Sequence, residues 1–237
     1  MTLRRALQKA KTAARANLLP GLLLQALMLV FLGLYLGSED TRRVLESVAA
    51  LKQRTGYAFS FVSYVIAAAL LPELLRVAFF QRGKVTRKNL WNFVTIAPFW
   101  GGMGMLVDLL YRLQALWFGS GHEVSTMLLK VTVDQFLFSP FISAPAIIGY
   151  LHWRDARFRV AALRGMATAD FFLEHIFPII VAGWCIWIPG VSLVYFMPPA
   201  LQLPVAVLIQ VFWVLILTTI SERRVNEPDD TTVQPLA

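Results

Sequence analysis

Long uncharged runs alternate with short charged stretches along most of this 237-residue chain. A helix needs about 20 apolar residues to cross the hydrocarbon core of a bilayer, which is about 30 Å thick. Four segments approach or exceed that length, and each is either uncharged or interrupted by one acidic and one basic residue: 18–36, 57–80, 91–118 and 127–151. The pattern therefore predicts four membrane-spanning helices before residue 152.

The longest uncharged run covers residues 176–220, which is 45 residues. As one helix it would extend about 67 Å, more than twice the hydrocarbon core, so the run is predicted to turn. Pro189-Gly190 and Pro198-Pro199 are both candidate turns, and the piece at 169–190 either spans the membrane or lies in its interface. We therefore expect an all-α, polytopic transmembrane helix bundle with five or six spans.

The composition supports a membrane protein and excludes several other classes. Hydrophobic residues make up 57% of the chain and charged residues only 15%, whereas soluble chains contain about 25% charged residues. The mean hydropathy is +0.62. A disulfide scaffold is excluded because Cys185 stands alone, and a disordered chain is excluded by the apolar content.

The basic residues gather in alternate connections between the runs. Residues 1–17, 81–90 and 152–168 are basic, whereas 119–126 contain neither Lys nor Arg. This is the distribution expected when the basic connections stay on the inner side of the membrane. The connection 37–56 departs from it, with four basic and three acidic residues. The basic residues lie between the hydrophobic runs and do not form one basic surface. No nucleic-acid partner is therefore expected.

Both ends of the chain are polar and flank a predicted transmembrane domain at residues 18–221. Residues 1–17 form a basic, acid-free amphipathic arm, which suits either anionic lipid headgroups or an organelle-targeting sequence. Residues 222–237 are predicted to be a polar C-terminal tail. The arm favours the mitochondrial inner membrane, although a bacterial inner membrane also satisfies the charge distribution.

The charged residues inside the third and fourth runs are the main candidate site. An ionisable side chain at the centre of a membrane costs about 2.5–3.5 kcal/mol on insertion scales, so it usually faces protein or water. Asp108 and Arg112 are four residues apart, as are Lys130 and Asp134, so each pair shares one helical face. With Gln135 beside them, the four are predicted to form a neutral cluster between two antiparallel helices. This cluster either fastens the helices together or lines a solute path.

Other ionisable residues near the ends of the runs are weaker candidates. Glu73 and Arg76 are three residues apart near the end of the second run, which is typical of an interfacial pair. Asp170, Glu174 and His175 precede the long uncharged run, where they lie either in the interface or in a second wet patch.

The sequence contains none of the motifs that support catalysis or cofactor binding. The three histidines are far apart, and no second cysteine is present to complete a metal site. Phosphate loops, dinucleotide fingerprints and nucleophile elbows are also absent. We therefore expect a protein that is not an enzyme, with no catalytic residues, metal or cofactor.

Several motifs, in order along the chain, resemble those of the Mpv/peroxisomal-membrane-protein family of organelle membrane proteins. Lys130 precedes the Asp134-Gln135 pair by four residues, as in that family. Pro140 follows this pair by five residues, again as in the family. Further matching positions are Pro98, Gly101, Gly102 and Asp108 upstream, and Trp184, Trp187, Pro189, Phe196, Pro198 and Trp213 downstream.

The resemblance covers residues 57–221 and implies a non-enzymatic, multi-pass protein of a mitochondrial, peroxisomal or plastid membrane. Members of the family are proposed to act as weakly selective channels for small solutes. The chain departs from the family at Ile188, because the family has a Trp before the corresponding Pro. Residues 1–56 have no counterpart in the family. These departures favour an alternative, an accessory or lipid-binding structural subunit of a larger complex. The expected partners are membrane lipids and either other membrane subunits or further copies of the chain.

Overall fold

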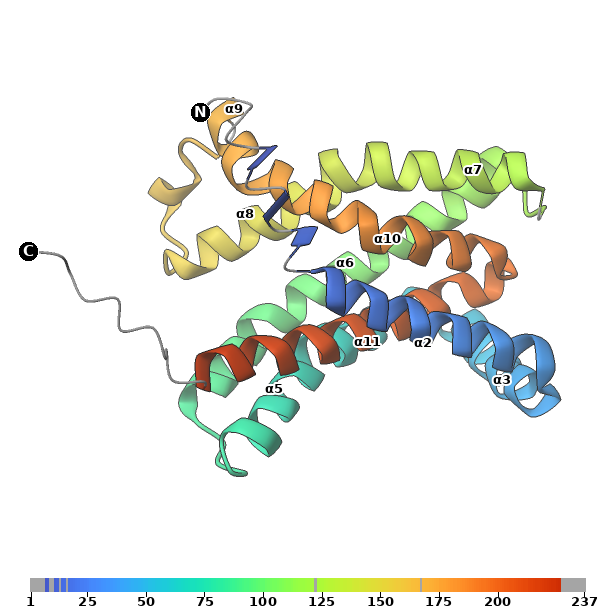
Figure 1. The fold of residues 1–237 in the computed structure, drawn as a ribbon, viewed down its shortest axis with the longest axis horizontal. Coiled ribbons are helices and arrows are strands. Elements are labelled where there is room, and N and C mark those ends of the chain that lie inside the picture. Colours follow the sequence, from blue (N-terminus) through green and yellow to red (C-terminus); the bar gives the residue numbers. More distant parts are fainter. Residues whose placement is uncertain are drawn as a thin grey trace, which may run out of the picture.

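The computed structural model describes residues 7, 8, 11, 12, 14, 15, 17–121, 123–166 and 168–226, with side chains up to residue 215. The predicted arm at 1–17 falls mostly outside these residues, as does the predicted tail from residue 227 onward. The described chain consists of helices joined by short turns, without a β-strand, which confirms the predicted all-α bundle (Figure 1).

The elements follow one another closely, and three long helices combine α-helical with π-helical segments. In chain order they are α2 (Leu18–Gly37), α3 (Glu39–Thr55), α4 (Tyr57–Val65), η1 (Ile66–Leu70), α5 (Leu71–Leu75), η2 (Arg76–Phe80), α6 (Arg87–Phe118), α7 (Val124–Thr132), η3 (Val133–Ser143), α8 (Ala144–Asp155), η4 (Val160–Leu163), α9 (Ala169–Phe171), η5 (Phe172–Ile176), α10 (Phe177–Phe196) and α11 (Pro199–Asn226). Of the η segments, η4 is a 3₁₀-helix and the others are π-helical.

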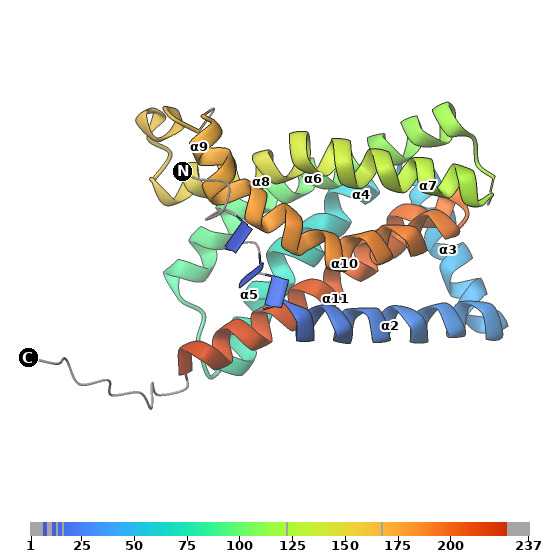
Figure 2. The ribbon, with the colours of Figure 1, turned by 45° about the horizontal axis from the view of Figure 1, so that its top comes forward.

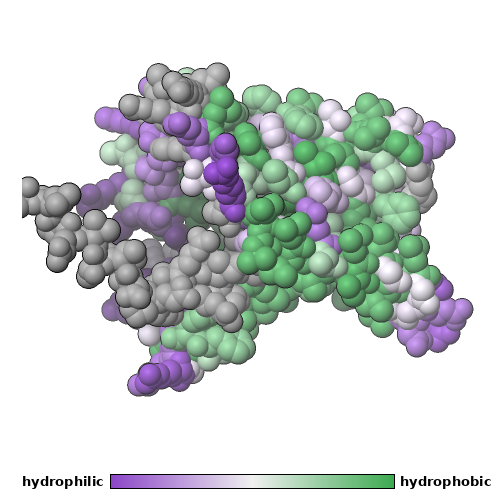
Figure 3. Space-filling view, viewed as in Figure 1, coloured by the Kyte–Doolittle hydropathy of each residue, from purple (hydrophilic) through white to green (hydrophobic). Residues whose placement is uncertain are grey.

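Within the described residues, five helices are long and apolar enough to cross a membrane. They are α2, α6 and the continuous helices Tyr57–Phe80, Val124–Asp155 and Ala169–Phe196. On the face shown in Figure 3, hydrophobic side chains cover most of the middle of the molecule, and hydrophilic ones gather toward its ends. This distribution matches a protein embedded in a bilayer, with its polar ends at the two surfaces.

The turn in the long uncharged run is at Pro198-Pro199 rather than at Pro189-Gly190. Pro189 lies inside α10, and α11 begins at Pro199. The piece at 169–190 therefore belongs to a continuous helix that is long enough to span. The sixth predicted span is α11, whose helical backbone continues to Asn226, so the first five residues of the predicted polar tail, 222–226, are helical.

The connection 37–56, which departs from the charge distribution, folds mostly as helix α3. The hydroxyl of Ser38 caps its N-terminus by accepting a hydrogen bond from the backbone N–H of Thr41 at 3.3 Å. Acidic residues occupy its first turn and basic residues its last turn, as the helix dipole favours. Lys52 in that last turn is buried rather than exposed to solvent.

Prolines explain three of the π-helical segments. A proline lies two residues after the end of each of these segments: Pro72 after η1, Pro145 after η3 and Pro178 after η5. A proline ring clashes with the carbonyl four residues earlier and cannot donate a hydrogen bond to it. The residue before each proline instead donates to the carbonyl five residues earlier, as Ala144 does to Ser139. The wider turn accommodates each ring without breaking the helix.

Helix α11 lies at the centre of the bundle. Its residues 201–206 are all buried, and it packs against α2, α3, α5, α6 and α10. In Figures 1 and 2 its red ribbon runs between α2 and α5. Because this part of α11 has no lipid-facing side, the amide of Gln202 is surrounded by protein.

Candidate functional site

The predicted site residues divide into two separate polar networks instead of one four-charge cluster. Asp108 and Arg112 lie on α6, Lys130 lies on α7, and Asp134 and Gln135 lie in η3. Each carboxylate has its own partners from other helices. The two networks therefore require separate interpretations.

The first network surrounds the fully buried carboxylate of Asp108. Its Oδ2 accepts hydrogen bonds from Ser60 Oγ at 2.8 Å and from Arg112 Nη2 at 3.1 Å, so the predicted Asp108–Arg112 pair is confirmed. The Nζ of Lys52 lies 3.0 Å from Oδ1, in an ion pair without the alignment of a hydrogen bond. The guanidinium of Arg112, half of whose side chain is exposed, also lies 4.7 Å from the ring centre of Tyr57.

The second network surrounds Asp134, and its hydrogen-bond donors are all neutral. Oδ2 accepts a hydrogen bond from the Tyr195 hydroxyl at 2.7 Å, and Oδ1 accepts one from Gln135 Nε2 at 2.8 Å. The Tyr195 hydroxyl accepts in turn from Gln114 Nε2 at 3.0 Å. The Tyr111 ring packs edge-on against Tyr195, with 5.5 Å between ring centres. This network joins η3 to α6 and α10.

The predicted pairing of Lys130 with Asp134 is wrong. Within the described part of the chain, no Lys, Arg or His nitrogen lies within 4.0 Å of the Asp134 carboxylate. Tyr195 explains the difference, because its hydroxyl donates to Asp134 while its ring faces Lys130, whose Nζ lies 6.0 Å from the ring centre. Helical spacing brought the two side chains to one face of the helix, but a residue of α10 became the partner of the carboxylate.

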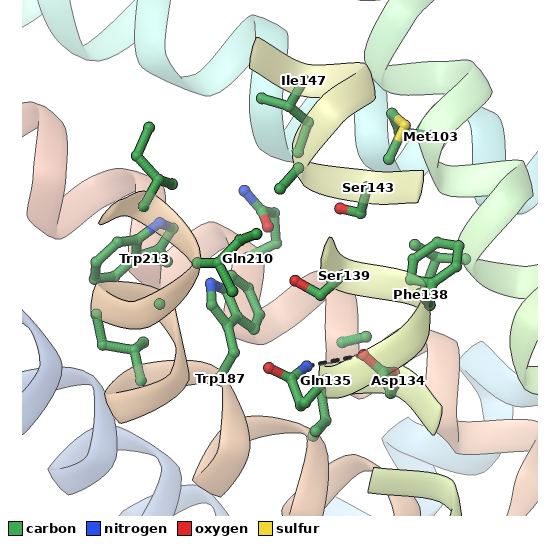
Figure 4. Close-up of a pocket in the computed structure, with 18 of the residues that line it drawn as sticks. Met103, Asp134, Gln135, Phe138, Ser139, Ser143, Ile147, Trp187, Gln210 and Trp213 are labelled. Atoms are coloured by element: carbon green, nitrogen blue, oxygen red, sulfur yellow. Dashed lines mark hydrogen bonds between the residues drawn. The ribbon is translucent and has the colours of Figure 1, made fainter. Parts of the chain in front are cut away.

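Asp134 lines a cavity of about 520 Å³ inside the bundle. One wall consists of Gln135, Ser139 and Ser143, which are spaced four residues apart along η3. The opposite wall includes Trp187 and residues of α11, Gln210 and Trp213 among them (Figure 4). Among the described residues that line the cavity, Asp134 is the only charged one. Asp108 and its partners do not line it.

The weaker candidates lie away from the cavity. Glu73 forms the predicted ion pair with Arg76, at 2.5 Å, and accepts hydrogen bonds from the Asn89 and Asn92 amides at 2.7 and 3.2 Å. These contacts fasten the helix Tyr57–Phe80 to the start of α6.

The three candidates before the long uncharged run are exposed at the start of their helix. Asp170 lies on α9, whereas Glu174 and His175 lie in η5. The His175 ring packs against Phe171, with 4.7 Å between ring centres. Within the described residues, no group of three His, Cys, Asp or Glu side chains is placed to hold a metal ion. The exposed position of these three residues at the start of the helix favours the membrane interface over a second wet patch.

Sequence reasoning missed the partners that come from distant helices. Lys52, Ser60 and Tyr195 each contact a site residue on another element, and Gln114 donates a hydrogen bond to Tyr195. One signal was present, because Lys52 belongs to the connection that departs from the charge distribution. An uncharged polar side chain such as Gln114, within an otherwise apolar run, is a second type of signal.

Tyr195→Phe is expected to lower the free energy of unfolding by about 1–3 kcal/mol, because it removes a donor to a buried carboxylate and leaves the Gln114 amide without its acceptor. Tyr111→Phe is a matched control, because its neighbouring ring is equally buried and its hydroxyl makes no hydrogen bond within the described chain. Unfolding in a denaturing detergent titration measures both. Equal losses for the two variants would contradict the assignment of the Tyr195 hydroxyl.

Comparisons of the chain with models of known protein families, with curated proteins and with solved structures gave no match. The resemblance of residues 57–221 to the Mpv/peroxisomal-membrane-protein family therefore remains a prediction that rests on the motif residues.

Proposed function

We propose that the protein is a weakly selective channel for small solutes, and that solutes pass through the cavity beside η3. The observation that carries this proposal is the row of Gln135, Ser139 and Ser143 along one wall of a cavity within an apolar bundle. Its volume of about 520 Å³ lies within the range of about 300–1,000 Å³ that is typical of small-molecule sites. In a membrane protein, such polar residues usually face a water-filled space or a binding partner.

The hydroxyl groups in this wall differ from others in the transmembrane helices. The hydroxyls of Thr132 and Ser192 each bond to the carbonyl four residues earlier in their own helix, at 2.7 Å in both cases. Ser139 and Ser143 make no such bond within the described structure, and Figure 4 shows both hydroxyls directed into the cavity. They are therefore available to hydrate or bind a solute.

The two polar networks support different roles under this proposal. The Asp108 network is closed, because Lys52, Ser60 and Arg112 occupy the carboxylate and none of them lines the cavity. It fastens α3 and α4 to α6. The Asp134 network contributes Asp134 and Gln135 to the lining of the cavity. The proposed solute path thus passes Asp134 but not Asp108.

Ser139→Phe is expected to lower the conductance of the purified protein in planar bilayers by about tenfold, because an apolar ring in the cavity narrows and dries the path. Thr132→Phe is the control, since Thr132 is exposed on the same helix and does not line the cavity. Conductance equally reduced in both variants, or unchanged in a folded Ser139→Phe protein, would contradict the proposal.

The second candidate is a non-catalytic accessory or lipid-binding subunit of a larger membrane complex. The closed Asp108 network favours it, because a buried network that joins three helices is suited to a rigid scaffold. Folded wild-type protein that conducts no solute, and that purifies natively only as part of a larger assembly, would support this candidate instead. For either function we propose the mitochondrial inner membrane, on the basis of the basic arm at 1–17.

A further inference from the structure

Asp134 lacks the close ion pairs that Asp108 has, because the buried ammonium of Lys130 faces the ring of Tyr195 instead. Asp108 is paired with Lys52 at 3.0 Å and with Arg112 at 3.1 Å. Asp134 accepts hydrogen bonds only from neutral donors of the described chain, and among the described residues that line the cavity it is the only charged one. A carboxylate without a direct ion-pair partner is costly in a low-dielectric environment. A positively charged ligand in the cavity would supply the missing charge.

The walls of the cavity are suited to an organic cation. They include the faces or edges of Trp187, Trp213, Trp100, Tyr64 and Tyr111. Trp187 and Trp213 lie close together at a steep angle, with 6.4 Å between ring centres and 68° between planes, so they form a corner. Aromatic rings attract Lys-like and quaternary ammonium groups through the cation–π interaction, which is strongest for indoles and for desolvated sites.

A divalent metal ion fits this cavity less well than an organic cation does. Calcium and magnesium ions take six or more oxygen ligands, usually from several carboxylates, carbonyls and waters. Here one carboxylate stands beside neutral amides, hydroxyls and aromatic rings. The described residues also contain no group of three acidic, His or Cys side chains placed to hold a metal ion.

We infer that the cavity binds a small organic cation, a quaternary or protonated amine, with Asp134 as its counter-ion and the indole and phenol rings as its walls. This inference rests on the proposed role of the cavity as a solute path, and it names the class of solute. It also assigns a role to the corner formed by Trp187 and Trp213. Their indole rings can bind a dehydrated cation through the cation–π interaction, which polar side chains alone do not provide.

The test is equilibrium binding of radiolabelled choline to the full-length protein in nanodiscs of phosphatidylglycerol, a lipid without an amine. We expect saturable binding that Asp134→Asn weakens by about 10- to 100-fold, because the substitution removes the counter-ion but keeps the shape and an acceptor. Trp187→Leu is expected to weaken it by about 3- to 30-fold. Glu123→Gln, at an exposed acidic residue outside the cavity, should leave it unchanged.

A competition experiment keeps the inference testable in the wild-type protein if a variant fails to fold. Unlabelled choline should displace the label at concentrations at least about tenfold lower than its neutral isostere, 3,3-dimethyl-1-butanol. Equal displacement by the two compounds, choline binding that a folded Asp134→Asn protein retains at wild-type affinity, or the absence of saturable choline binding would each overturn the inference.

Two further comparisons identify the source of the bound cation and test the cation site independently of the channel. Repeating the measurement in phosphatidylcholine discs distinguishes a free amine from a lipid headgroup. A headgroup occupant would abolish saturable choline binding there, whereas a free solute would still bind with the same number of sites, at an affinity lowered only by the loss of the anionic surface. Choline binding in a protein that conducts nothing would remove the channel but keep the cation site. Conductance without choline binding would remove the cation site but keep the channel.

Discussion

Asp108→Ala is expected to lower the free energy of unfolding by about 3–5 kcal/mol, because it leaves the buried ammonium of Lys52 without its anion. The side chains of Lys52 and Asp108 are only 8% and 0% exposed, so neither charge can be hydrated in place. Arg112 contributes less to this cost, since 49% of its side chain is exposed and can reach the membrane surface. The measurement is unfolding of the purified protein in a denaturing detergent titration.

A double substitution separates the cost of leaving Lys52 unpaired from the cost of losing the other contacts of Asp108. Asp108→Leu combined with Lys52→Met removes both charges together, and it should recover most of the stability that Asp108→Ala loses. Asp155→Ala serves as a control, because Asp155 pairs with Arg154 at 2.8 Å but is mostly exposed, and it should change stability little. A double variant as unstable as the single one would show that the unpaired charge of Lys52 does not cause the loss of stability.

Gly104→Ala is expected to lower the free energy of unfolding by about 1–3 kcal/mol through overpacking. A Cβ at this position would collide with the backbone carbonyl of Ser60 and lie 2.7 Å from the Cβ of Tyr64. Neither atom can rotate away, because both belong to the adjacent helix α4 close to its backbone. The contact between α4 and α6 must therefore widen, and the widening also disturbs the Ser60–Asp108 hydrogen bond.

Gly102→Ala on the same helix is the matched control. Its new Cβ would meet nothing within 4 Å, and alanine is favoured over glycine in a helix interior by about 1 kcal/mol. We therefore expect unchanged or slightly increased stability. The two variants can be compared by thermal unfolding in a mild detergent. A Gly104→Ala protein as stable as the Gly102→Ala protein would contradict the close approach of α4 and α6.

Pairs that lie within one helix could be predicted from the sequence. Asp108 with Arg112 and Glu73 with Arg76 are separated by four and three residues, and both ion pairs form. Helix geometry alone places side chains at these spacings next to one another. Lys130 and Asp134 are also four residues apart but do not pair. A shared face of one helix is therefore necessary, but not sufficient, for an ion pair within that helix.

Partners across helices could not be predicted in this way. Lys52 lies on α3 and Tyr195 on α10, and nothing in their local sequence identifies the carboxylate that each contacts. The cavity is a further example, because its walls come from several helices together, among them α4, α6, η3, α8, α10 and α11. The polar spacing of Gln135, Ser139 and Ser143 is visible in the sequence, but the aromatic wall opposite is not.

The sequence by itself determined the fold class and the approximate positions of the spans. Bilayer thickness sets the length of an uncharged run, and backbone groups in lipid must be bonded within their own segment, so such runs become helices. Tertiary structure decided where the longest run turns, which helix lies at the centre, and that Lys52 joins Arg112 at the carboxylate of Asp108. It also decided that Asp134 faces a cavity, because these outcomes depend on packing between helices rather than on spacing along one helix.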